Sequence, residues 1–166
     1  MVFAVIASVL LGGVMTLGDW VWAAMHLPHR VAYGITHGAT MCLCVGLAVG
    51  IRAGKPLPGA LAGPVIGVLA ALSFYALAPM IRWSAMFPAW MLLWILFAVL
   101  QYWLSKKESL GAALARGLAA ALLSGAAFYA ISGIWINDSH SNPNLLRHFA
   151  AWSFAFLPGF LALFWR

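Results

Sequence analysis

The stretch that decides the fold is residues 18–37, which read GDWVWAAMHLPHRVAYGITH. It holds one of the chain's three acidic residues and three of its five histidines, between long runs of apolar sequence. Pro28 marks a break near its middle, because proline begins a helix better than it continues one. We therefore predict that two apolar helices meet near residues 27–28 and form a hairpin.

The composition indicates an integral membrane protein. Of the 166 residues, 65% are hydrophobic and 7% are charged, whereas about a quarter of the residues in a typical soluble domain are charged. The mean hydropathy is +0.99. Since one spanning helix needs roughly 20 residues, the chain has room for about six of them, with five as the alternative. We predict one all-α domain over residues 1–166, a polytopic bundle of transmembrane helices.

The breaks between apolar runs predict where the helices lie. Six helices are expected, at residues 2–25, 29–51, 59–78, 85–104, 109–136 and 145–165. The connections between them contain the prolines, glycines and polar residues that favour turns. Glycines recur at intervals of four in the second and third helices, as at Gly59, Gly63 and Gly67. Such rows predict faces on which helices pack closely.

The basic residues predict the orientation of the bundle. Six follow the second and fourth helices or lie near that side: Arg52, Lys55, Lys106, Lys107, Arg116 and Arg166. The other three, Arg30, Arg82 and Arg147, lie on the opposite side. Since loops rich in lysine and arginine stay in the cytoplasm, both termini are expected there. The chain is thus predicted to be a multi-pass protein of the bacterial inner membrane.

The net charge of +6 is explained by this orientation and by contact with lipid headgroups. The basic residues form no arm or stripe, so nucleic acid is not an expected partner. The expected partners are the lipid bilayer and a small amphiphilic or anionic ligand. A chain this small is also a candidate for homo-oligomerisation, although no motif demands it.

The hairpin predicts a polar site. Asp19 and His37 lie about eight and nine residues from the turn, so both are expected roughly 12–14 Å beneath it. Tyr33 lies nearer the surface on the second helix, and His26 and His29 lie on either side of the turn. Equal depth allows Asp19 and His37 to meet. If the helix ran straight through, they would be about 27 Å apart.

An aspartate inside a membrane helix is costly and needs a partner. Asp19 paired with His37 or with Arg30 would satisfy this need and would only fix helix packing. A carboxylate with imidazoles is also a ligand set for zinc, iron or manganese. The same groups titrate, so they are equally able to relay protons. The residues alone leave these three alternatives open.

Two further groups belong to the same side of the predicted bundle. Asp138, His140 and His148 would complete the site if the last helix packs near the hairpin, although His140 also fits a solvated loop. Arg30, Arg82 and Arg147 mark the three outer connections, one each. Arginine suits phosphate because its guanidinium is planar and bidentate. The three arginines would hold an anionic headgroup, or would only reach to the interface.

The residues Asp19, His29-Arg30 and Gly34-Ile35-Thr36-His37 resemble the signature of the small bacterial membrane-bound metal-dependent hydrolases. That family has an acid-rich Asp/His segment followed by a His-Arg-Gly-x-Thr-His element within a multi-pass helical domain. The resemblance covers about twenty residues. It implies that Asp19, His29 and His37 are metal ligands, with Arg30 nearby.

Three functions follow from these patterns. The first is a metal-dependent membrane hydrolase acting on an amphiphilic substrate such as a lipid phosphoester. Its predicted catalytic residues are Asp19, His26 and His37; its substrate-binding residues are Arg30, Tyr33, Arg82, Arg147 and Asp138; and its metal ligands are Asp19, His29, His37 and His148. The metal would activate water. No haem, retinal or nucleotide motif is present.

The second function is a small transporter or ligand-binding protein. Its binding or proton-coupling site would be the Asp19/His37 pair in the bundle interior. The third is a non-catalytic membrane subunit whose polar pair only fixes packing. The number and chemical variety of the polar groups on the outer side place the enzyme narrowly first.

Overall fold

The computed structural model describes residues 1–25, 30–137 and 144–165, without the side chains of residues 22, 23, 25, 30 and 132–137. Within these residues the regular structure is entirely helical. The elements are α1 (Val2–Met25), α2 (Arg30–Ala53), α3 (Pro56–Ile81), the 3-10 turn η1 (Arg82–Ala85), α4 (Met86–Ser105), α5 (Leu110–Asn137) and α6 (Leu145–Phe164). The predicted all-α class is confirmed.

The helix boundaries lie within three residues of the predicted ones. The largest differences are at α3, which begins at Pro56 rather than at residue 59 and ends at Ile81 rather than at residue 78. Proline fits the first turn of a helix because the amide hydrogen it lacks would have no partner there. Pro79 lies inside α3, and membrane helices tolerate such prolines.

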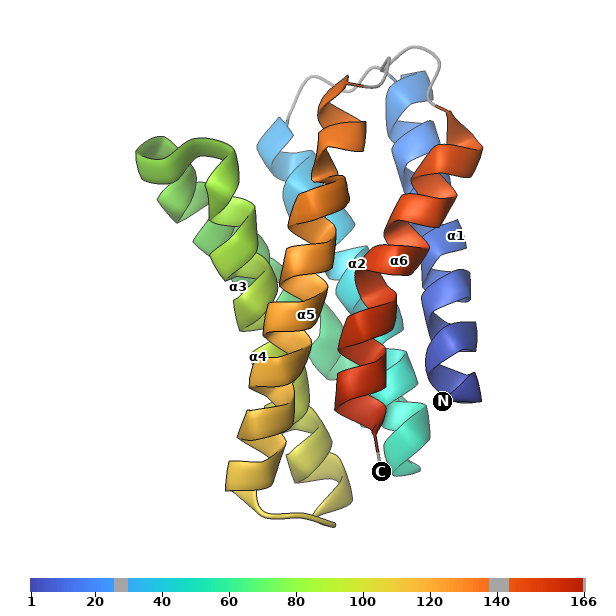
Figure 1. The fold of residues 1–166 in the computed structure, drawn as a ribbon, viewed down its shortest axis with the longest axis vertical. Helices are drawn as coiled ribbons and strands as arrows, with labels where there is room; N and C mark the ends of the chain where they lie inside the picture. Colours follow the sequence, from blue (N-terminus) through green and yellow to red (C-terminus); the bar gives the residue numbers. More distant parts are fainter. Residues whose placement is uncertain (26–29, 138–143, 166) are drawn as a thin grey trace.

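Among the residues that the structure describes, five helical stretches are long and apolar enough to cross a membrane: Val2–Val21, Val31–Ala53, Pro56–Ser105, Leu110–Ile131 and Leu145–Phe164. The third contains 50 residues and would be about 75 Å long if it were straight. Figure 1 shows that the chain instead reverses direction at η1, so that α3 and α4 lie side by side. The 50-residue stretch therefore consists of two antiparallel helices, as the prediction of six membrane crossings requires.

The first and last helices are neighbours. The α6 helix packs against α1 and α5, while α4 packs against α5 and α2 packs against α3. The contact between α1 and α2 is smaller than the contact of α1 with α6 or of α2 with α3. Both termini lie at one end of the bundle (Figure 1). We call this the terminal end, and the opposite end, which carries η1, the η1 end.

Glycine determines how closely α2 and α3 approach. A Cβ atom added at Gly63 would overlap the carbonyl of Cys42, and one added at Gly67 would overlap the carbonyl of Gly38. A Cβ at Gly46 would overlap the carbonyl of Gly59. The predicted close packing of the glycine faces is therefore confirmed, and α2 and α3 are each other's partners.

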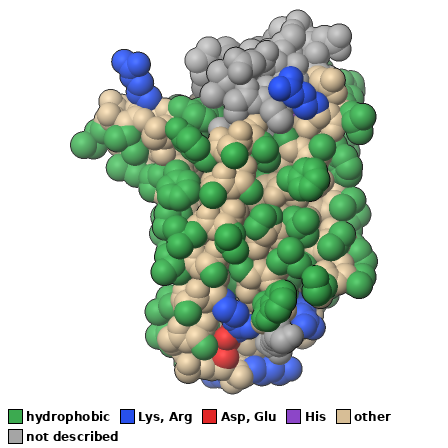
Figure 2. All heavy atoms as spheres, viewed as in Figure 1, with side chains coloured by type: hydrophobic (Ala, Val, Ile, Leu, Met, Phe, Trp, Pro, Cys, Tyr) green, Lys and Arg blue, Asp and Glu red, His purple; other side chains and the backbone are tan. Residues whose placement is uncertain are grey.

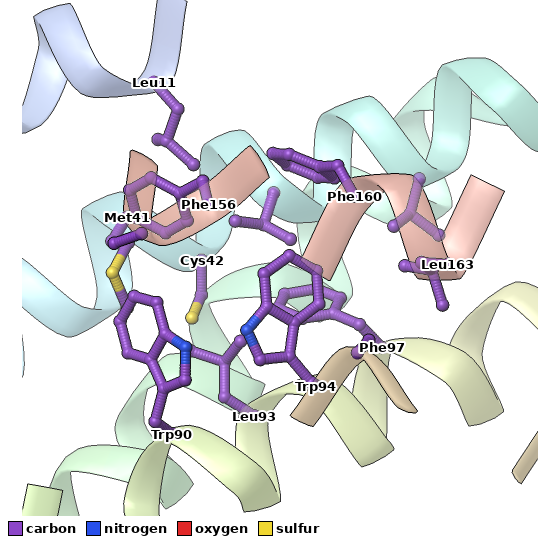
Figure 3. Packing of buried hydrophobic residues seen from close by; sticks show 14 of the residues in the cluster. Leu11, Met41, Cys42, Trp90, Leu93, Trp94, Phe97, Phe156, Phe160 and Leu163 are labelled. Atoms are coloured by element: carbon purple, nitrogen blue, oxygen red, sulfur yellow. The ribbon is translucent and has the colours of Figure 1, made fainter. Parts of the chain in front are cut away.

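The core is rich in aromatic side chains from α4 and α6. Trp94, Phe97, Phe156 and Phe160 are fully buried, and Figure 3 shows them packed against one another. Trp94 and Phe160 meet edge to face, with ring centroids 5.3 Å apart. These ring contacts join α6 to α4, while α1 and α5 are the helices that α6 packs against most closely.

The surface has two charged ends and an apolar middle. Figure 2 shows hydrophobic side chains covering the central band and basic side chains at both ends. Arg82 and Arg147 are exposed at the η1 end, and Lys55 and Lys106 are exposed at the terminal end. On α3 a row of exposed leucines and valines faces outward: Leu57, Leu61, Val65 and Leu69. This distribution suits a protein surrounded by lipid.

Candidate functional site

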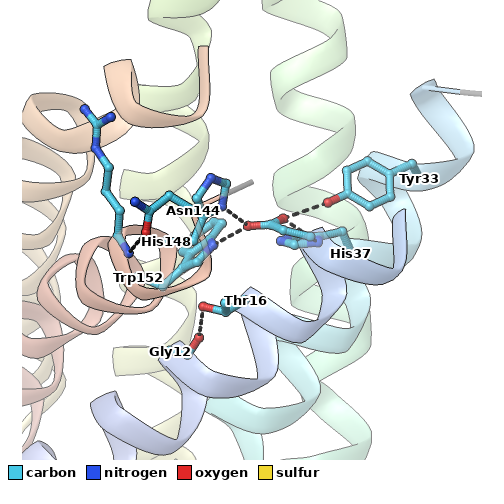
Figure 4. A network of polar contacts seen from close by, with 9 residues as sticks. Gly12, Thr16, Tyr33, His37, Asn144, His148 and Trp152 are labelled. Carbon is cyan, nitrogen blue, oxygen red and sulfur yellow. Dashed lines mark hydrogen bonds and ion pairs between the residues drawn. The ribbon is translucent and has the colours of Figure 1, made fainter. Parts of the chain in front are cut away.

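The site is built around the carboxylate of Asp19, near the end of α1. Its Oδ1 accepts a hydrogen bond from the Tyr33 hydroxyl at 3.0 Å. Its Oδ2 accepts one from the Trp152 indole nitrogen at 2.7 Å and lies 3.2 Å from His148 Nδ1. The Asp19 side chain is 15% exposed. Figure 4 shows these groups converging on the carboxylate from α2 and α6.

His37 completes the group. Its Nδ1 lies 4.0 Å from Asp19 Oδ1, and its ring contacts those of Tyr33 and Trp152 with centroids 5.1 and 5.6 Å apart. The His37 ring lies beside Gly18, where a Cβ would be 3.7 Å from Nδ1, an ordinary van der Waals distance. The predicted meeting of Asp19 and His37 is thus confirmed. We call Asp19, Tyr33, His37, His148 and Trp152 the Asp19 cluster.

The start of α6 positions two members of this cluster. Asn144 caps the helix, because its side-chain oxygen accepts a hydrogen bond from the backbone N–H of Arg147 at 3.0 Å. Such a cap fixes where the first turn begins. His148 and Trp152 are four residues apart and therefore lie on one face of α6. Both are buried, at 6% and 7% exposure.

The cluster has an unusual charge balance. In the described part of the chain, Asp19 forms no ion pair with a lysine or an arginine, and its partners within 4.0 Å that can carry a positive charge are His37 and His148, which are charged only when protonated. Glu108 at the terminal end differs, since it forms an ion pair with Arg116. A carboxylate in a membrane span is costly without compensation.

The structure brings together four of the residues predicted for the site: Asp19, Tyr33, His37 and His148. Arg82 and Arg147 are exposed, and neither side chain forms a described hydrogen bond or ion pair with the cluster. His26, His29, Asp138 and His140 lie outside the described residues, as does the side chain of Arg30. The roles predicted for these residues stay predictions.

Trp152 is the member that sequence reasoning missed. An indole N–H is a hydrogen-bond donor and can satisfy a buried carboxylate, but the site predicted from the sequence included no tryptophan. The available signal was its spacing from His148, because residues four apart share a helix face. Recognising it also required the pairing of α1 with α6, which no local pattern encodes.

The described residues do not by themselves form a metal site. Among them no group of three or more His, Cys, Asp or Glu side chains has an arrangement that could hold a metal ion. Both carboxylate oxygens of Asp19 accept hydrogen bonds, Oδ1 from the Tyr33 hydroxyl and Oδ2 from the Trp152 indole N–H. The Trp152 indole N–H is a donor only and offers no lone pair to a cation. The predicted metal set therefore depends on residues outside the described ones, such as His29.

No family model, curated protein or solved structure matches this chain. The function is therefore argued from the Asp19 cluster and its place in the bundle.

Proposed function

We propose that this chain is a small membrane transport protein whose proton-binding site is Asp19, with His37 and His148 as its titrating neighbours. The observation that carries the proposal is a carboxylate inside an apolar span that has histidines, and no described lysine or arginine, as charged neighbours. Ionisable residues in such positions typically mark ion pathways and proton relays. The proposal follows the second of the three functions that the sequence left open.

The two histidines support a proton-binding role. Imidazole changes charge near neutral pH, unlike guanidinium. A guanidinium partner, such as Arg116 beside Glu108 at the terminal end, stays charged throughout the physiological pH range. The Asp19–His148 contact, at 3.2 Å, is an ion pair only while the His148 imidazole carries its second proton.

The cluster also links proton binding to helix position. The hydrogen bonds of Asp19 reach Tyr33 on α2 and Trp152 on α6. Protonation of the carboxylate weakens both bonds, because bonds to a charged acceptor are stronger than bonds to a neutral one. A change at this one residue therefore alters the attachment of two other helices, which is the property that coupled transport requires.

The first experiment measures proton movement in vesicles. The purified chain is reconstituted into liposomes that contain an entrapped pH-sensitive dye, and an outward potassium gradient with valinomycin drives proton entry. We expect the wild type to acidify the lumen. Asp19→Asn should reduce the rate at least about tenfold, because the amide has nearly the same shape but cannot take up a proton.

Glu108→Gln is the matched control. It makes the same chemical change in the other described carboxylate, which lies outside the cluster, and it should leave the rate at the wild-type value. Equal rates for wild type, Asp19→Asn and empty liposomes would refute the proposal.

The metal-dependent hydrolase stays a prediction from the sequence resemblance. It is tested on the same preparation by measuring zinc, iron and manganese per chain after purification without chelator. One metal per chain that is lost in Asp19→Ala together with His37→Ala would favour the enzyme. A folded wild type that takes up no metal would exclude the metal-dependent hydrolase and leave the transport protein.

A further inference from the structure

A proline interrupts the hydrogen bonding of α6. Pro158 has no backbone N–H, so the carbonyl of Phe154, four residues earlier, lacks the N–H partner that it would have in a regular helix. Proline is a common cause of a bend in a helix, and Figure 1 shows α6 changing direction part-way along its length. We call residues 145–157 the cluster segment of α6 and residues 159–164 its terminal segment.

The terminal segment is held by α4 and α5. A Cβ at Gly159 would overlap a tryptophan ring of α4, so the two helices are in close contact there. Gln101 of α4 donates a hydrogen bond from Nε2 to the carbonyl of Leu163 at 3.3 Å. Arg116 of α5 donates from its guanidinium to the carbonyl of Trp165, directly after the segment, at 3.0 Å. None of these contacts involves the Asp19 cluster, so a change in the cluster leaves the terminal segment attached.

The bend itself is anchored to the same two helices. The hydroxyl of Ser124, on α5, donates to the carbonyl of Ala155 at 2.5 Å and accepts a hydrogen bond from the indole N–H of Trp90, on α4, at 2.7 Å. Ala155 lies three residues before Pro158, in the turn that the proline weakens. Ser124 and Ala155 are both fully buried. These two bonds give a bending motion of α6 a fixed point.

The cluster segment is attached differently, because its polar bonds to α1 end on one carboxylate. Trp152 donates to Asp19 Oδ2 at 2.7 Å, and His148 Nδ1 lies 3.2 Å from the same oxygen. Nearer the bend, α1 presents Gly12 to Ser153, and this contact contains no charged group. The strength of the polar attachment between the segment and α1 therefore depends on the state of Asp19.

From these attachments we infer that α6 is hinged at Pro158, and that the cluster segment swings away from α1 when its bonds to Asp19 weaken. The inference rests on the proposed function for the event that weakens these bonds. From Leu146 to Pro158 the segment is about 18 Å long, so a change of about 15° in the bend moves its far end by about 5 Å. The movement opens the Asp19 cluster towards the η1 end while the terminal end stays closed, which is the one-sided access that transporters use.

The first test measures the hinge without transport. Spin labels are attached at Leu17→Cys on α1 and Leu146→Cys on α6, both exposed positions, in a background that has alanine at positions 42 and 44. Their distance is measured in lipid nanodiscs by electron paramagnetic resonance. Asp19→Asn supplies a neutral and therefore weaker acceptor. We expect it to lengthen the distance by about 5 Å, as the geometry of the hinge predicts.

A second pair of labels and a second variant control this measurement. Val2→Cys and Trp165→Cys join the same two helices at the terminal end, and both positions are exposed. Their distance should stay unchanged in Asp19→Asn. Trp152→Phe removes one bond to the carboxylate and keeps the carboxylate itself, and it should lengthen the distance between positions 17 and 146 in the same direction. All variants are compared at wild-type helix content.

Pro158→Ala tests the position of the hinge. Alanine restores the missing N–H and makes the helix continuous, so the lengthening caused by Asp19→Asn should disappear in the double variant. In liposomes, Pro158→Ala alone should slow proton flux about fivefold, the factor that corresponds to one added hydrogen bond that must break. Pro64→Ala is the matched control, since Pro64 lies inside α3. It should leave both the distance and the flux unchanged.

The outcomes separate the two proposals. If Asp19→Asn stops the flux while the distance between positions 17 and 146 is unchanged in it and in Trp152→Phe, the proton-binding site stands and the hinge is wrong. A lengthening that persists in the presence of Pro158→Ala also overturns the hinge. If the distance lengthens as expected but Asp19→Asn carries protons at the wild-type rate, the hinge stands and the proposed function fails.

Discussion

The Trp152 indole makes the shortest hydrogen bond to Asp19, at 2.7 Å. Trp152→Phe removes this donor and keeps an aromatic ring that can stack on Phe156, whose centroid is 5.7 Å away. We expect a loss of about 1–2 kcal/mol in the free energy of unfolding, since bonds to charged groups are strong but membrane interiors moderate their net value. The measurement is thermal or denaturant unfolding in detergent.

Trp103→Phe is the control for this substitution. Trp103 is 63% exposed on α4, so the same chemical change there should shift stability by less than about 0.5 kcal/mol. Equal losses at the two positions would mean that the Trp152 bond to the carboxylate contributes nothing specific.

Single residues of the site were predictable where local geometry sufficed. Asp19 and His37 are equally far from the Pro28 break, so a hairpin places them at one depth, and the structure confirms the pair at 4.0 Å. Trp152 was not predictable in this way. Its bond to Asp19 joins residues 133 positions apart, and the pairing of α1 with α6 that brings them together is a property of the whole bundle.

At the scale of the helix, the α2–α3 contact makes the sharpest prediction. A Cβ at Gly63 would overlap the backbone of Cys42 and Leu43, and backbone cannot move aside as a flexible side chain can. Gly63→Ala should therefore force the helices apart and cost about 1–3 kcal/mol. Unfolding in detergent checks the loss, and a changed distance between spin labels on α2 and α3 checks its cause.

Gly111→Ala should not lower the free energy of unfolding as Gly63→Ala does. A Cβ at Gly111, in the first turn of α5, would meet nothing closer than the Ser109 hydroxyl at 4.0 Å. Alanine favours a helix over glycine by up to about 1 kcal/mol, so this variant should be neutral or slightly more stable. A loss at Gly111 similar to that at Gly63 would show that helix propensity, and not close approach, explains the result.

The helices themselves followed from the sequence because each apolar run ends at turn-forming residues. The glycine rows also identified the faces that pack closely. The glycine rows did not predict which helices pack together, because a row of small residues on one helix fits a similar row on any other helix. The continuation of α3 through Pro79 to Ile81 was likewise missed, since neighbouring structure satisfies the backbone groups that proline leaves free.

For the whole molecule, the predicted orientation is the property most open to a direct test. Exposed basic side chains lie at both ends of the bundle, and both termini lie at one of them (Figures 1 and 2). Ser84, in η1, and Ser109, between α4 and α5, are exposed at opposite ends. Serine to cysteine changes neither charge nor length greatly, so neither substitution disturbs the distribution of lysine and arginine that sets orientation.

We expect a membrane-impermeant maleimide to label Ser84→Cys in intact cells and to label Ser109→Cys only after the membrane is opened. Both variants are made in a background with Cys42→Ala and Cys44→Ala. This pattern follows from the greater number of basic residues at the terminal end, which keeps that end in the cytoplasm. It also requires an even number of crossings, because the termini share one end. The reverse pattern would contradict the predicted orientation and would place the Asp19 cluster in the cytoplasmic half of the bundle.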